Sequence, residues 1–395
     1  MSETEYGPAT TAIHVGQEPD PITGAVLPSP VLATTFVMDE PGIPRAGYDY
    51  SRSGNPTRDL FGQTLAALEH GERGFALPSG LAAEDLLLRV LTRPGDSAVF
   101  SADVYGGTFR LFTQVFAAEG RTARPVGAGL AQIKEALEEI RPAVLWLETP
   151  SNPQLDIIDI AQAAQAAHQV GALLVVDNTF ASPALQQPLT LGADVVVHST
   201  TKSIGGHSDL VGGAIVTAAH ARLPKGRTGV SGSKSIAEEV AYWQNATGCV
   251  ASPQDAWLAS RGLKTLAVRV QQANASALKI AQALKELPGV KQVIYPGLPE
   301  HRGHETAKKQ MSGFGAVVAF RVDSPKAARA ICKRTKLFAL AVSLGSVESL
   351  IEQPASMTHA TKADDETAIP EDLIRLAVGL EDVEDLIADL KQAIG

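Results

Sequence analysis

The chain has 395 residues, of which 45% are hydrophobic and 19% charged, and its formal net charge is −9. This length predicts two or three domains around a sizeable core, and an acidic chain without a basic stripe argues against nucleic acid as the main partner. Cys249 and Cys332 are far apart and in no metal-ligand spacing, so we expect no disulfide framework, no metal and a reducing, cytoplasmic setting. No apolar run reaches the roughly 18 residues that span a bilayer, and no signal-peptide pattern opens the chain, so no membrane partner is expected.

Residues 1 to about 58 are rich in Pro and Gly and show few helix-period patterns, which is typical of an arm rather than a core. The arm contains a polar and aromatic stretch over 47–58, Gly-Tyr-Asp-Tyr-Ser-Arg-Ser-Gly-Asn-Pro-Thr-Arg. An exposed surface loop would explain this composition. Alternatively, Tyr50 and Arg52 could bind a phosphate, with the guanidinium of Arg52 as a forked donor.

Between residues 59 and 250, short apolar runs alternate with helical patterns, which indicates one large domain. Helices are predicted over 82–91, 130–140 and 160–170, and strands over 75–77, 97–100, 144–147, 173–176, 195–197 and 214–217. Continuous apolar strands separated by helices indicate a mostly parallel sheet that is covered on both faces. The predicted fold class is therefore α/β.

Polar residues directly follow three of these strands. Residues 148–152 follow the strand predicted over 144–147, Asp177 follows the strand over 173–176, and Lys202 comes after the strand over 195–197. Because ligands bind at the carboxyl ends of strands in open sheets of this kind, the three positions predict a site at one edge of the sheet.

The rest of the chain is interpreted as a loop and a smaller α/β domain. Residues 223–234 are rich in Pro, Lys, Gly, Ser and Thr and predict a flexible excursion, followed by a helix over 236–246. The smaller domain would occupy 251–395. It is predicted to contain one long helix over 263–287, antiparallel strands near 293–294 and 316–320, and helices near 325–333 and 382–393.

Lys202 lies just past a buried apolar run, between hydroxyl-bearing residues and two glycines. A lysine at such a place is costly unless it is exposed or used, and a desolvated lysine can become an imine-forming nucleophile. An ordinary turn lysine is the alternative. We interpret Lys202 as the Schiff-base lysine of a pyridoxal phosphate enzyme, because other residues supply what this cofactor needs.

Each part of pyridoxal phosphate has a candidate partner. Asp177 can keep the ring nitrogen protonated, so that the ring acts as an electron sink, although it could also cap a helix. Tyr105, flanked by glycines, can stack on the ring or pack in the core. The phosphate suits a helix start and the hydroxyls near a strand end, at Gly80, Leu81, Ser199 and Thr201.

Many short motifs along the chain occur in the order of a known family. They occupy residues 12–16, 50–57, 79–83, 103–107, 148–153, 176–180, 199–202, 206–209, 261–265, 295–299, 357–360 and 374–382. With these motifs, nearly the whole chain resembles the Cys/Met-metabolism family of pyridoxal phosphate-dependent enzymes, and most of all its cystathionine γ-lyases and γ-synthases. The resemblance implies the fold of the fold type I pyridoxal phosphate-dependent transferases.

The resemblance also implies a role for each matched residue. Lys202 would form the Schiff base and move protons, Asp177 would hold the ring nitrogen, and Tyr105 would stack on the ring and relay a proton. Tyr50 and Arg52 match residues that reach the neighbouring subunit's cofactor, which implies a homo-oligomer, usually a tetramer of two dimers. The amino-acid substrate would be bound by Arg375, Asn152, Ser343 and Arg110.

Three positions depart from the family pattern. Ser203 follows the lysine where the family often has Tyr or Phe. Val342 stands where cystathionine-handling members commonly carry Glu, and resembles methionine γ-lyases and some β-lyases there. Gly107 replaces the cysteine that is characteristic of methionine γ-lyases. The stretch 227–234 has no assigned role.

The leading expectation is the γ-lyase reaction, α,γ-elimination of cystathionine to cysteine, 2-oxobutanoate and ammonia. The closest alternative is γ-replacement on an O-acyl-homoserine, as in a γ-synthase or a sulfhydrylase, and the β-lyase and methionine γ-lyase reactions stay open. A non-catalytic scaffold of the same fold is the alternative from another class, and the intact cofactor residues argue against it.

Overall fold

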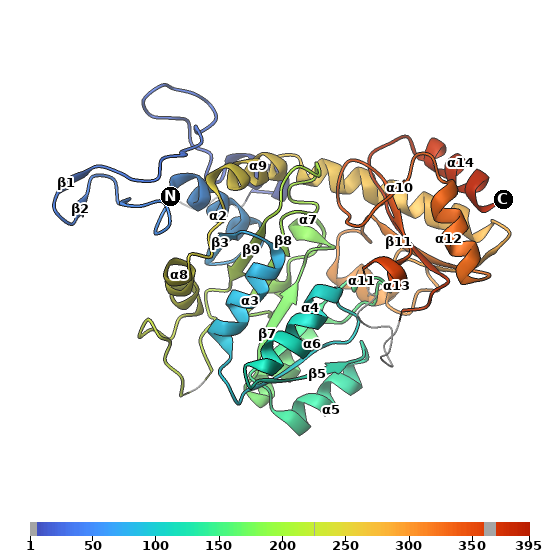
Figure 1. The fold of residues 1–395 in the computed structure, drawn as a ribbon, viewed down its shortest axis with the longest axis horizontal. Coiled ribbons are helices and arrows are strands. Elements are labelled where there is room, and N and C mark those ends of the chain that lie inside the picture. Colours follow the sequence, from blue (N-terminus) through green and yellow to red (C-terminus); the bar gives the residue numbers. More distant parts are fainter. Residues whose placement is uncertain (1–5, 225, 359–368) are drawn as a thin grey trace.

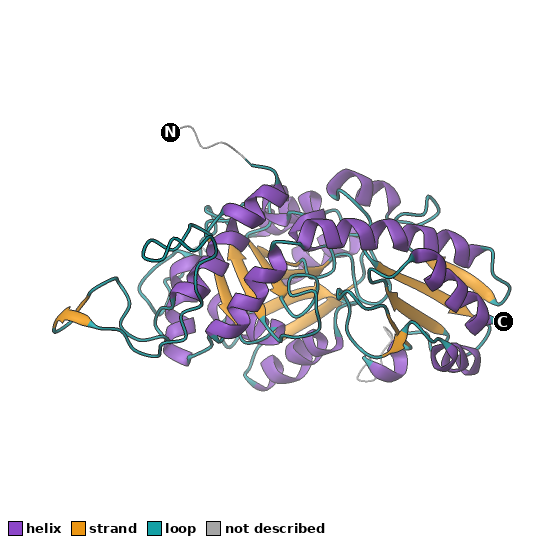
Figure 2. Cartoon of the chain, turned by 90° about the horizontal axis from the view of Figure 1, so that it is seen from above, coloured by secondary structure: helices purple, strands orange, loops and turns teal. Residues whose placement is uncertain are grey.

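The structure is a computed structural model that describes residues 6–224, 226–358 and 369–395. A large α/β domain fills the centre of Figure 1, a smaller C-terminal domain lies to its right, and an N-terminal arm extends to the left. Figure 2 shows helices on both sides of the strands in the large domain, as the continuous apolar strands predict. The α/β fold class expected from the sequence is thus confirmed.

The large domain is built on a seven-stranded sheet with the order β3-β9-β8-β7-β6-β4-β5. Its strands are β3 (Arg73–Leu77), β4 (Ser97–Ser101), β5 (Thr122–Val126), β6 (Val144–Glu148), β7 (Leu173–Asp177), β8 (Val195–Ser199) and β9 (Gly213–Thr217). The strands from β8 to β5 are parallel, and β9 runs antiparallel to both of its neighbours. Because Glu148 pairs in register with Asp177, and Asp177 with Val197, strands β6, β7 and β8 end at the same edge.

Helices cover this sheet and begin where the sequence supplies caps. Ser79 accepts a hydrogen bond from the Ala82 amide at the start of α3, and Asp159 does the same for the Gln162 amide at the start of α6. The helical segments are α2 (Pro56–Leu68), α3 (Gly80–Leu91), α4 (Gly106–Arg110) with a π-helical turn (Leu111–Phe116), α5 (Leu130–Ile140), α6 (Ile160–Val170), α7 (Ser182–Leu185), a 3-10 turn (Pro188–Leu191) and α8 (Ile236–Thr247).

The C-terminal domain has a five-stranded sheet with the order β10-β11-β14-β13-β12, antiparallel except for the β12–β13 pair. Its strands are β10 (Val290–Ile294), β11 (Val317–Val322), β12 (Ala339–Leu340), β13 (Leu350–Glu352) and β14 (Leu373–Ala377). Its helices, together with those that join it to the large domain, are α9 (Pro253–Leu263), α10 (Leu266–Lys285), α11 (His304–Gln310), α12 (Pro325–Arg334), α13 (Pro354–Met357) and α14 (Val383–Ile394).

The long helix predicted over 263–287 is interrupted at its start. Helix α9 ends at Leu263 and α10 begins only at Leu266, because Thr265 takes a non-helical backbone conformation. The apolar pattern runs through this break, and the glycine that could have marked it, Gly262, lies one residue before the end of α9. The boundary was therefore placed wrongly from the sequence.

The loop predicted as a flexible excursion is closed on itself and tied to the large domain. The Leu223 amide donates to the Lys234 carbonyl at 2.9 Å, so the two ends of the loop meet. Arg227 donates to Asp96 at 2.6 Å, and Glu239 accepts the backbone amide of Val230 at 2.6 Å. These contacts give 227–234 a structural role that the sequence analysis did not assign.

Helix α1 (Pro8–His14) of the arm packs against α2, and its Ala12 is buried in the core of the large domain. The part of the arm that contains β1 (Met38–Glu40) and β2 (Ile43–Pro44) reaches away from the large domain (Figure 1). Among the described residues, no helix is long and apolar enough to cross a membrane. The same part of the chain holds no group of three or more His, Cys, Asp or Glu side chains that could bind a metal ion.

Candidate active site

A cavity of about 520 Å³ opens at the edge of the large sheet where β6, β7 and β8 end, and the C-terminal domain supplies its other wall. All of the predicted site residues except Tyr50 and Arg52 line it: Gly80, Leu81, Tyr105, Arg110, Asn152, Asp177, Ser199, Thr201, Lys202, Ser343 and Arg375. The fold therefore brings together residues that are up to 295 positions apart in the chain.

A second cavity of about 530 Å³ lies beside β10 and holds none of these residues. Cations around it are already paired, such as Lys285 with Glu300 at 2.5 Å and Arg321 with Asp372 at 2.9 Å. The cavity at the end of β8 is the better candidate for the functional site. It contains a buried lysine with a lowered pKa, buried polar atoms without a hydrogen-bond partner among the described residues, and a serine with a strained backbone.

Lys202 reaches across the cavity from the end of β8. Its Nζ donates a hydrogen bond to Ser343 Oγ at 2.7 Å. Burial and, to a smaller extent, the nearby Arg375 cation together lower the pKa of Lys202 to about 8, against the opposing effect of Glu352. An amine that loses its proton this readily suits both imine formation and proton transfer.

Ser343 holds an unusual backbone conformation at this point, with φ of +96°. Residues with a Cβ rarely adopt positive φ, and such strain persists only where surrounding contacts enforce it. Two contacts do so here, because Ser343 accepts a hydrogen bond from Lys202 through Oγ and one from Arg375 through its carbonyl oxygen at 2.8 Å. Ser343 thus spans the space between the amine and the guanidinium.

Arg375 lies on β14 and is only 2% exposed. It donates to Asn152 Oδ1 at 2.8 Å and forms an ion pair with Glu352 at 3.1 Å. Its Nε has no hydrogen-bond partner among the described residues. Burial lowers the pKa of Arg375, and a fixed, buried guanidinium with a donor to spare suits a carboxylate ligand.

Asp177 ends β7 and is 8% exposed. Burial raises its pKa, while a hydrogen bond from the Thr179 amide at 2.9 Å and the nearby His198 oppose that rise. His198 is itself buried and contacts Glu69 through Nε2 at 2.7 Å. A buried carboxylate held in this way suits a cationic ring nitrogen.

The N-terminus of α3 faces the cavity and has room for an anion. A Cβ at Gly80 would lie 2.9 Å from Ser199 Cβ, so a larger residue would fill the space between the helix start and the end of β8. The exposed amides of a helix start attract a phosphate, and the hydroxyls of Ser199 and Thr201 line the same space.

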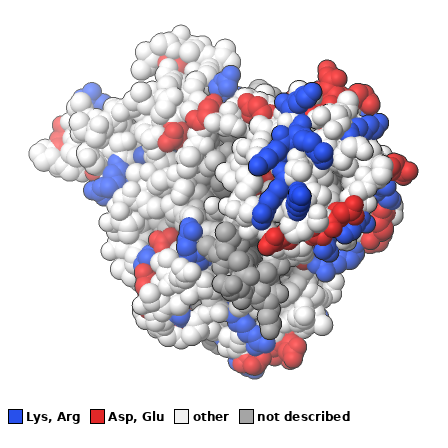
Figure 3. All heavy atoms as spheres, turned by 45° about the vertical axis from the view of Figure 1, so that its right-hand side comes forward, with Lys and Arg blue, Asp and Glu red and all other residues white. Residues whose placement is uncertain are grey.

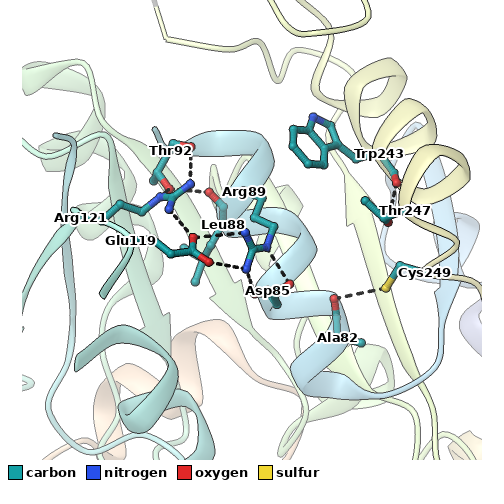
Figure 4. A network of polar contacts seen from close by, with 10 residues as sticks. All are labelled: Ala82, Asp85, Leu88, Arg89, Thr92, Glu119, Arg121, Trp243, Thr247 and Cys249. Carbon is teal, nitrogen blue, oxygen red and sulfur yellow. Dashed lines mark hydrogen bonds and ion pairs between the residues drawn. The ribbon is translucent and has the colours of Figure 1, made fainter. Parts of the chain in front are cut away.

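The outer face of α3 is fixed by a network of charged residues (Figure 4). Arg89 pairs with Asp85 at 2.9 Å on its own helix and with Glu119 at 2.8 Å. Glu119 also forms an ion pair with Arg121 at 2.6 Å. Arg121 in turn donates a hydrogen bond at 2.9 Å to Oγ1 of Thr92, just beyond the end of the helix. These contacts tie the outer face of α3 to the segment that precedes β5, and neither Asp85 nor Arg89 lines the cavity.

Tyr105 stands at the mouth of the cavity and is 42% exposed, while its backbone amide donates to the buried Glu148 at 2.9 Å. A Cβ at Gly107 would lie 2.5 Å from the Tyr105 ring and 3.0 Å from Leu81. The ring therefore has this orientation only because position 107 is glycine. Arg110 lines the same mouth one turn further along α4.

Tyr50 and Arg52 lie outside this cavity in the described chain. Arg52 donates to the side chain of Asn245 on α8 at 2.6 Å, and its guanidinium lies 5.8 Å from the centre of the exposed Tyr50 ring. Arg52 lines a separate hollow of about 330 Å³ together with Tyr48 and Arg73. The predicted role of Tyr50 and Arg52 toward a neighbouring subunit stays a prediction.

The residues of the cavity fit pyridoxal phosphate on structural grounds alone. A buried carboxylate at Asp177, a low-pKa amine at Lys202 and an anion seat at Gly80 open into one space. A volume of about 520 Å³ falls in the range of small-molecule sites, which is roughly 300–1,000 Å³. These residues could hold the ring nitrogen, the aldehyde and the phosphate respectively.

Two departures from the family pattern acquire a structural setting. Ser203 is buried, and its backbone packs against Gly345. A Cβ added at position 345 would lie only 2.5 Å from the Ser203 amide nitrogen. Val342 lines the cavity and is 52% exposed. The cavity wall beside Ser343 is therefore apolar where an acidic side chain was the family expectation.

The sequence analysis missed several buried polar residues of the site. Glu84 and Glu352 were not singled out, although both are at least 95% buried and contact the cavity or its arginine. A signal for Glu84 existed, because it lies four residues after Gly80 and so on the same face of a predicted helix. Glu352 had no such signal, since its partner is 23 positions away.

The sequence model of the family described as "Cys/Met metabolism PLP-dependent enzyme" matches residues 9–395. Among curated relatives, a cystathionine γ-synthase of Mycobacterium tuberculosis is 48% identical over 98% of this chain and 97% of its own length. A cystathionine β-lyase of Coxiella burnetii is 43% identical, and a cystathionine γ-lyase of Dictyostelium discoideum 44%, each over 98% of this chain and at least 97% of its own length.

Solved structures agree with these sequence relatives. A crystal structure of cystathionine γ-synthase from Xanthomonas oryzae pv. oryzae, in complex with aminoacrylate and cysteine, superposes with a TM-score of 0.92. It is 42% identical and covers 99% of this chain and 98% of its own. The relatives thus share a fold while their names cover γ-synthase, β-lyase and γ-lyase reactions.

Proposed function

Because the chain belongs to the Cys/Met metabolism family of pyridoxal phosphate-dependent enzymes, we propose that it makes or breaks carbon–sulfur bonds at the γ-carbon of a four-carbon amino acid. Our first candidate is γ-replacement, in which the thiol sulfur of cysteine bonds to the γ-carbon of an O-acyl-homoserine, the Cγ–O bond breaks and the acyl group leaves as a free carboxylate, to give cystathionine. Relatives named cystathionine γ-synthase, at 48% identity, support placing this reaction ahead of the γ-lyase reaction that the sequence analysis placed first.

The observation that carries the proposal is the position of Ser343 between Lys202 and Arg375. Its Oγ accepts from Lys202 Nζ at 2.7 Å and its carbonyl oxygen accepts from Arg375 at 2.8 Å. An amino acid whose carboxylate binds Arg375 would therefore place its α-carbon beside Lys202. Its side chain would extend toward the part of the cavity that Val342 and Tyr105 line.

When bound, the cofactor supplies an electron sink for a carbanion at the substrate's α-carbon. The chain's own residues would move the protons. With a pKa of about 8, Lys202 Nζ can accept a proton near neutral pH and return it to a neighbouring carbon. The Tyr105 hydroxyl would relay a proton to the leaving group at the cavity mouth, while Asp177 would balance the charge of the ring nitrogen.

A second candidate is γ-elimination, and Val342 is the observation that favours it. An apolar, half-exposed side chain beside Ser343 offers no charge to the distal ammonium of cystathionine. A substrate with an uncharged thioether, such as methionine, would fit that wall. Gly107 argues against the methionine γ-lyase form of this reaction, because the characteristic cysteine would collide with the Tyr105 ring as it lies here.

The product from defined substrates tests the two candidates. The purified enzyme with pyridoxal phosphate would be given O-succinyl- or O-acetyl-homoserine plus cysteine, cystathionine alone, and methionine alone. Cystathionine from the first mixture, at a higher kcat/KM than any keto acid release, is the expected result. Faster release of 2-oxobutanoate from cystathionine or methionine would replace γ-replacement with γ-elimination, and pyruvate would indicate β-cleavage.

We also propose that the arm docks on a second copy of the chain. Ile22 and Val26 are 92% and 85% exposed, and such apolar exposure on an extended arm indicates an interface. In Figure 3 the charged side chains gather over the C-terminal domain, while the surface to the left is largely uncharged. Docking would bring Tyr50 and Arg52 to the neighbouring cofactor and give a homo-oligomer, in keeping with the family's tetramers.

Mixing two inactive variants tests this shared site. Arg52→Ala would damage the neighbouring site and Lys202→Ala its own, so mixed oligomers would contain some sites with both residues intact. Activity that returns after the two are unfolded and refolded together, and not after simple mixing of stable oligomers, is expected. If co-refolding restores no activity, both residues serve the same subunit's site.

A further inference from the structure

Glu84 is a buried carboxyl that faces the cofactor cavity and that the proposed mechanism does not use. It lies on α3, is 4% exposed and lines the cavity. Its Oε1 accepts a hydrogen bond from Thr108 Oγ1 at 3.0 Å. Its Oε2 is fully buried and has no hydrogen-bond partner among the described residues, and such an atom is costly unless a ligand satisfies it.

The helix geometry places this carboxyl near the seat for the phosphate. Glu84 lies four residues after Gly80, so the two share one face of α3. Helical side chains lean toward the N-terminus, which carries the Glu84 carboxyl back over the turn at Gly80 and Leu81. The carboxyl also lies close enough to Asp177 for the charge of that carboxylate to raise its pKa.

Burial and a neighbouring carboxylate both favour the neutral form of Glu84. Burial raises its pKa well above the usual range, and the Asp177 carboxylate raises it further, while the bond from Thr108 opposes both. The other ionisable groups that line the cavity are Glu148 on β6, Lys202 after β8, Tyr105 and Arg110 at its mouth and Arg375 on β14, with His198 behind Asp177. Of these, Glu148 is itself buried, and burial together with Asp177 raises its pKa as well.

We propose that Glu84 is a cofactor-binding residue that enters the site as a neutral acid and donates a hydrogen bond from Oε2 to bound pyridoxal phosphate. An ionised Glu84 would repel the phosphate that the start of α3 attracts, whereas a neutral acid adds a donor without a charge. The donor set of the cavity thereby extends beyond the helix amides, Ser199 and Thr201. This inference rests on the family's cofactor and not on which carbon–sulfur reaction occurs.

Infrared difference spectroscopy tests the protonation directly. Cofactor-free wild type and the Glu84→Gln variant would be compared at neutral pH, before and after pyridoxine 5′-phosphate is added. This probe lacks the aldehyde, so Lys202 cannot react with it. The wild type is expected to show the carbonyl stretch of one protonated carboxyl that Glu84→Gln lacks, and this band should shift when the probe binds.

Affinity for the same probe supplies a second measurement. Glu84→Gln keeps a neutral donor and should bind within about threefold of wild type, whereas Glu84→Val removes the donor and should bind about tenfold more weakly. Asp85→Asn is the matched control, because Asp85 is the adjacent carboxyl on the outer face of α3, where Arg89 engages it (Figure 4). It should bind as wild type does.

Three outcomes would overturn the proposal: no protonated-carboxyl band in the wild type, a band that the probe does not shift, or equal affinity in wild type and Glu84→Val. If Glu84→Gln does not fold, Thr108→Val replaces it in the infrared test. Loss of the bond to Oε1 should move the same band without removing it. A band that Thr108→Val leaves unmoved would contradict the assignment.

Discussion

Replacing Lys202 with methionine should stabilise the cofactor-free protein, although it removes the proposed catalytic amine. Burial lowers the pKa of Lys202 from its ordinary value of 10.5 to about 8. Since one pKa unit corresponds to about 1.4 kcal/mol, keeping this amine protonated in the folded state costs roughly 3 kcal/mol. Methionine fills a similar volume and carries no charge.

The sign of the effect follows from proton binding. The folded-state pKa lies below the unfolded one, so the unfolded state holds more protons between about pH 8 and 10.5, and wild-type stability rises across that interval. The gain in unfolding free energy from relieving the cost of the charged amine in Lys202→Met is therefore complete below about pH 8 and lost above about pH 10.5. The lost hydrogen bond to Ser343 takes back about 1 kcal/mol, which leaves a net gain of about 2 kcal/mol at neutral pH.

Urea unfolding of the cofactor-free proteins at neutral pH and at about pH 10 measures this difference. Lys326→Met is the control, because Lys326 is exposed on α12 and its removal should leave stability within about 0.5 kcal/mol at either pH. A stability difference between wild type and Lys202→Met that does not change with pH would refute the reasoning. So would a variant less stable than wild type at neutral pH.

The remaining predictions concern the substrate clamp and two glycines of the cavity. Arg375→Ala should raise the KM for the amino-acid substrate about 100-fold. It should also lower the free energy of unfolding by about 3 kcal/mol, because Glu352 is left buried and unpaired. A KM within threefold of wild type in steady-state assays would contradict the role of Arg375 in binding the substrate carboxylate. Gly80→Ala should weaken pyridoxal phosphate binding about tenfold, since its Cβ would meet the end of β8 at 2.9 Å; unchanged affinity in a titration of cofactor-free protein would remove the anion seat from this position. Gly107→Cys should displace the Tyr105 ring and lower kcat more than tenfold while cofactor affinity changes little, and a crystal structure with the ring unmoved would show that the glycine is not what fixes it.

Much of the large domain could be predicted because its strands are short, apolar and continuous. The apolar runs at 173–176 and 195–197 form β7 and β8, and the polar residues Asp177 and Lys202 that follow them line one cavity. Local signals were sufficient there, since a parallel sheet brings the carboxyl ends of neighbouring strands to the same edge.

What the sequence did not predict depends on contacts between distant residues. The loop around Arg227 is anchored by Asp96, which lies 131 positions earlier in the chain. The buried ion pair of Arg375 with Glu352 arises where β13 pairs with β14, 23 positions further along the chain. Ser343 takes its positive φ between Lys202 of the large domain and Arg375. Hydrophobic periodicity carries no information on such pairs.

Lys202 is the residue that we propose binds the cofactor's aldehyde, and every step proposed for the active site needs it there. Treating the yellow holoenzyme with borohydride, digesting it and mapping the labelled peptide measures this most directly. We expect a single pyridoxyl label on Lys202, and no label in the Lys202→Met variant. A label on another lysine, or one that persists in that variant, would contradict the assignment of the active site.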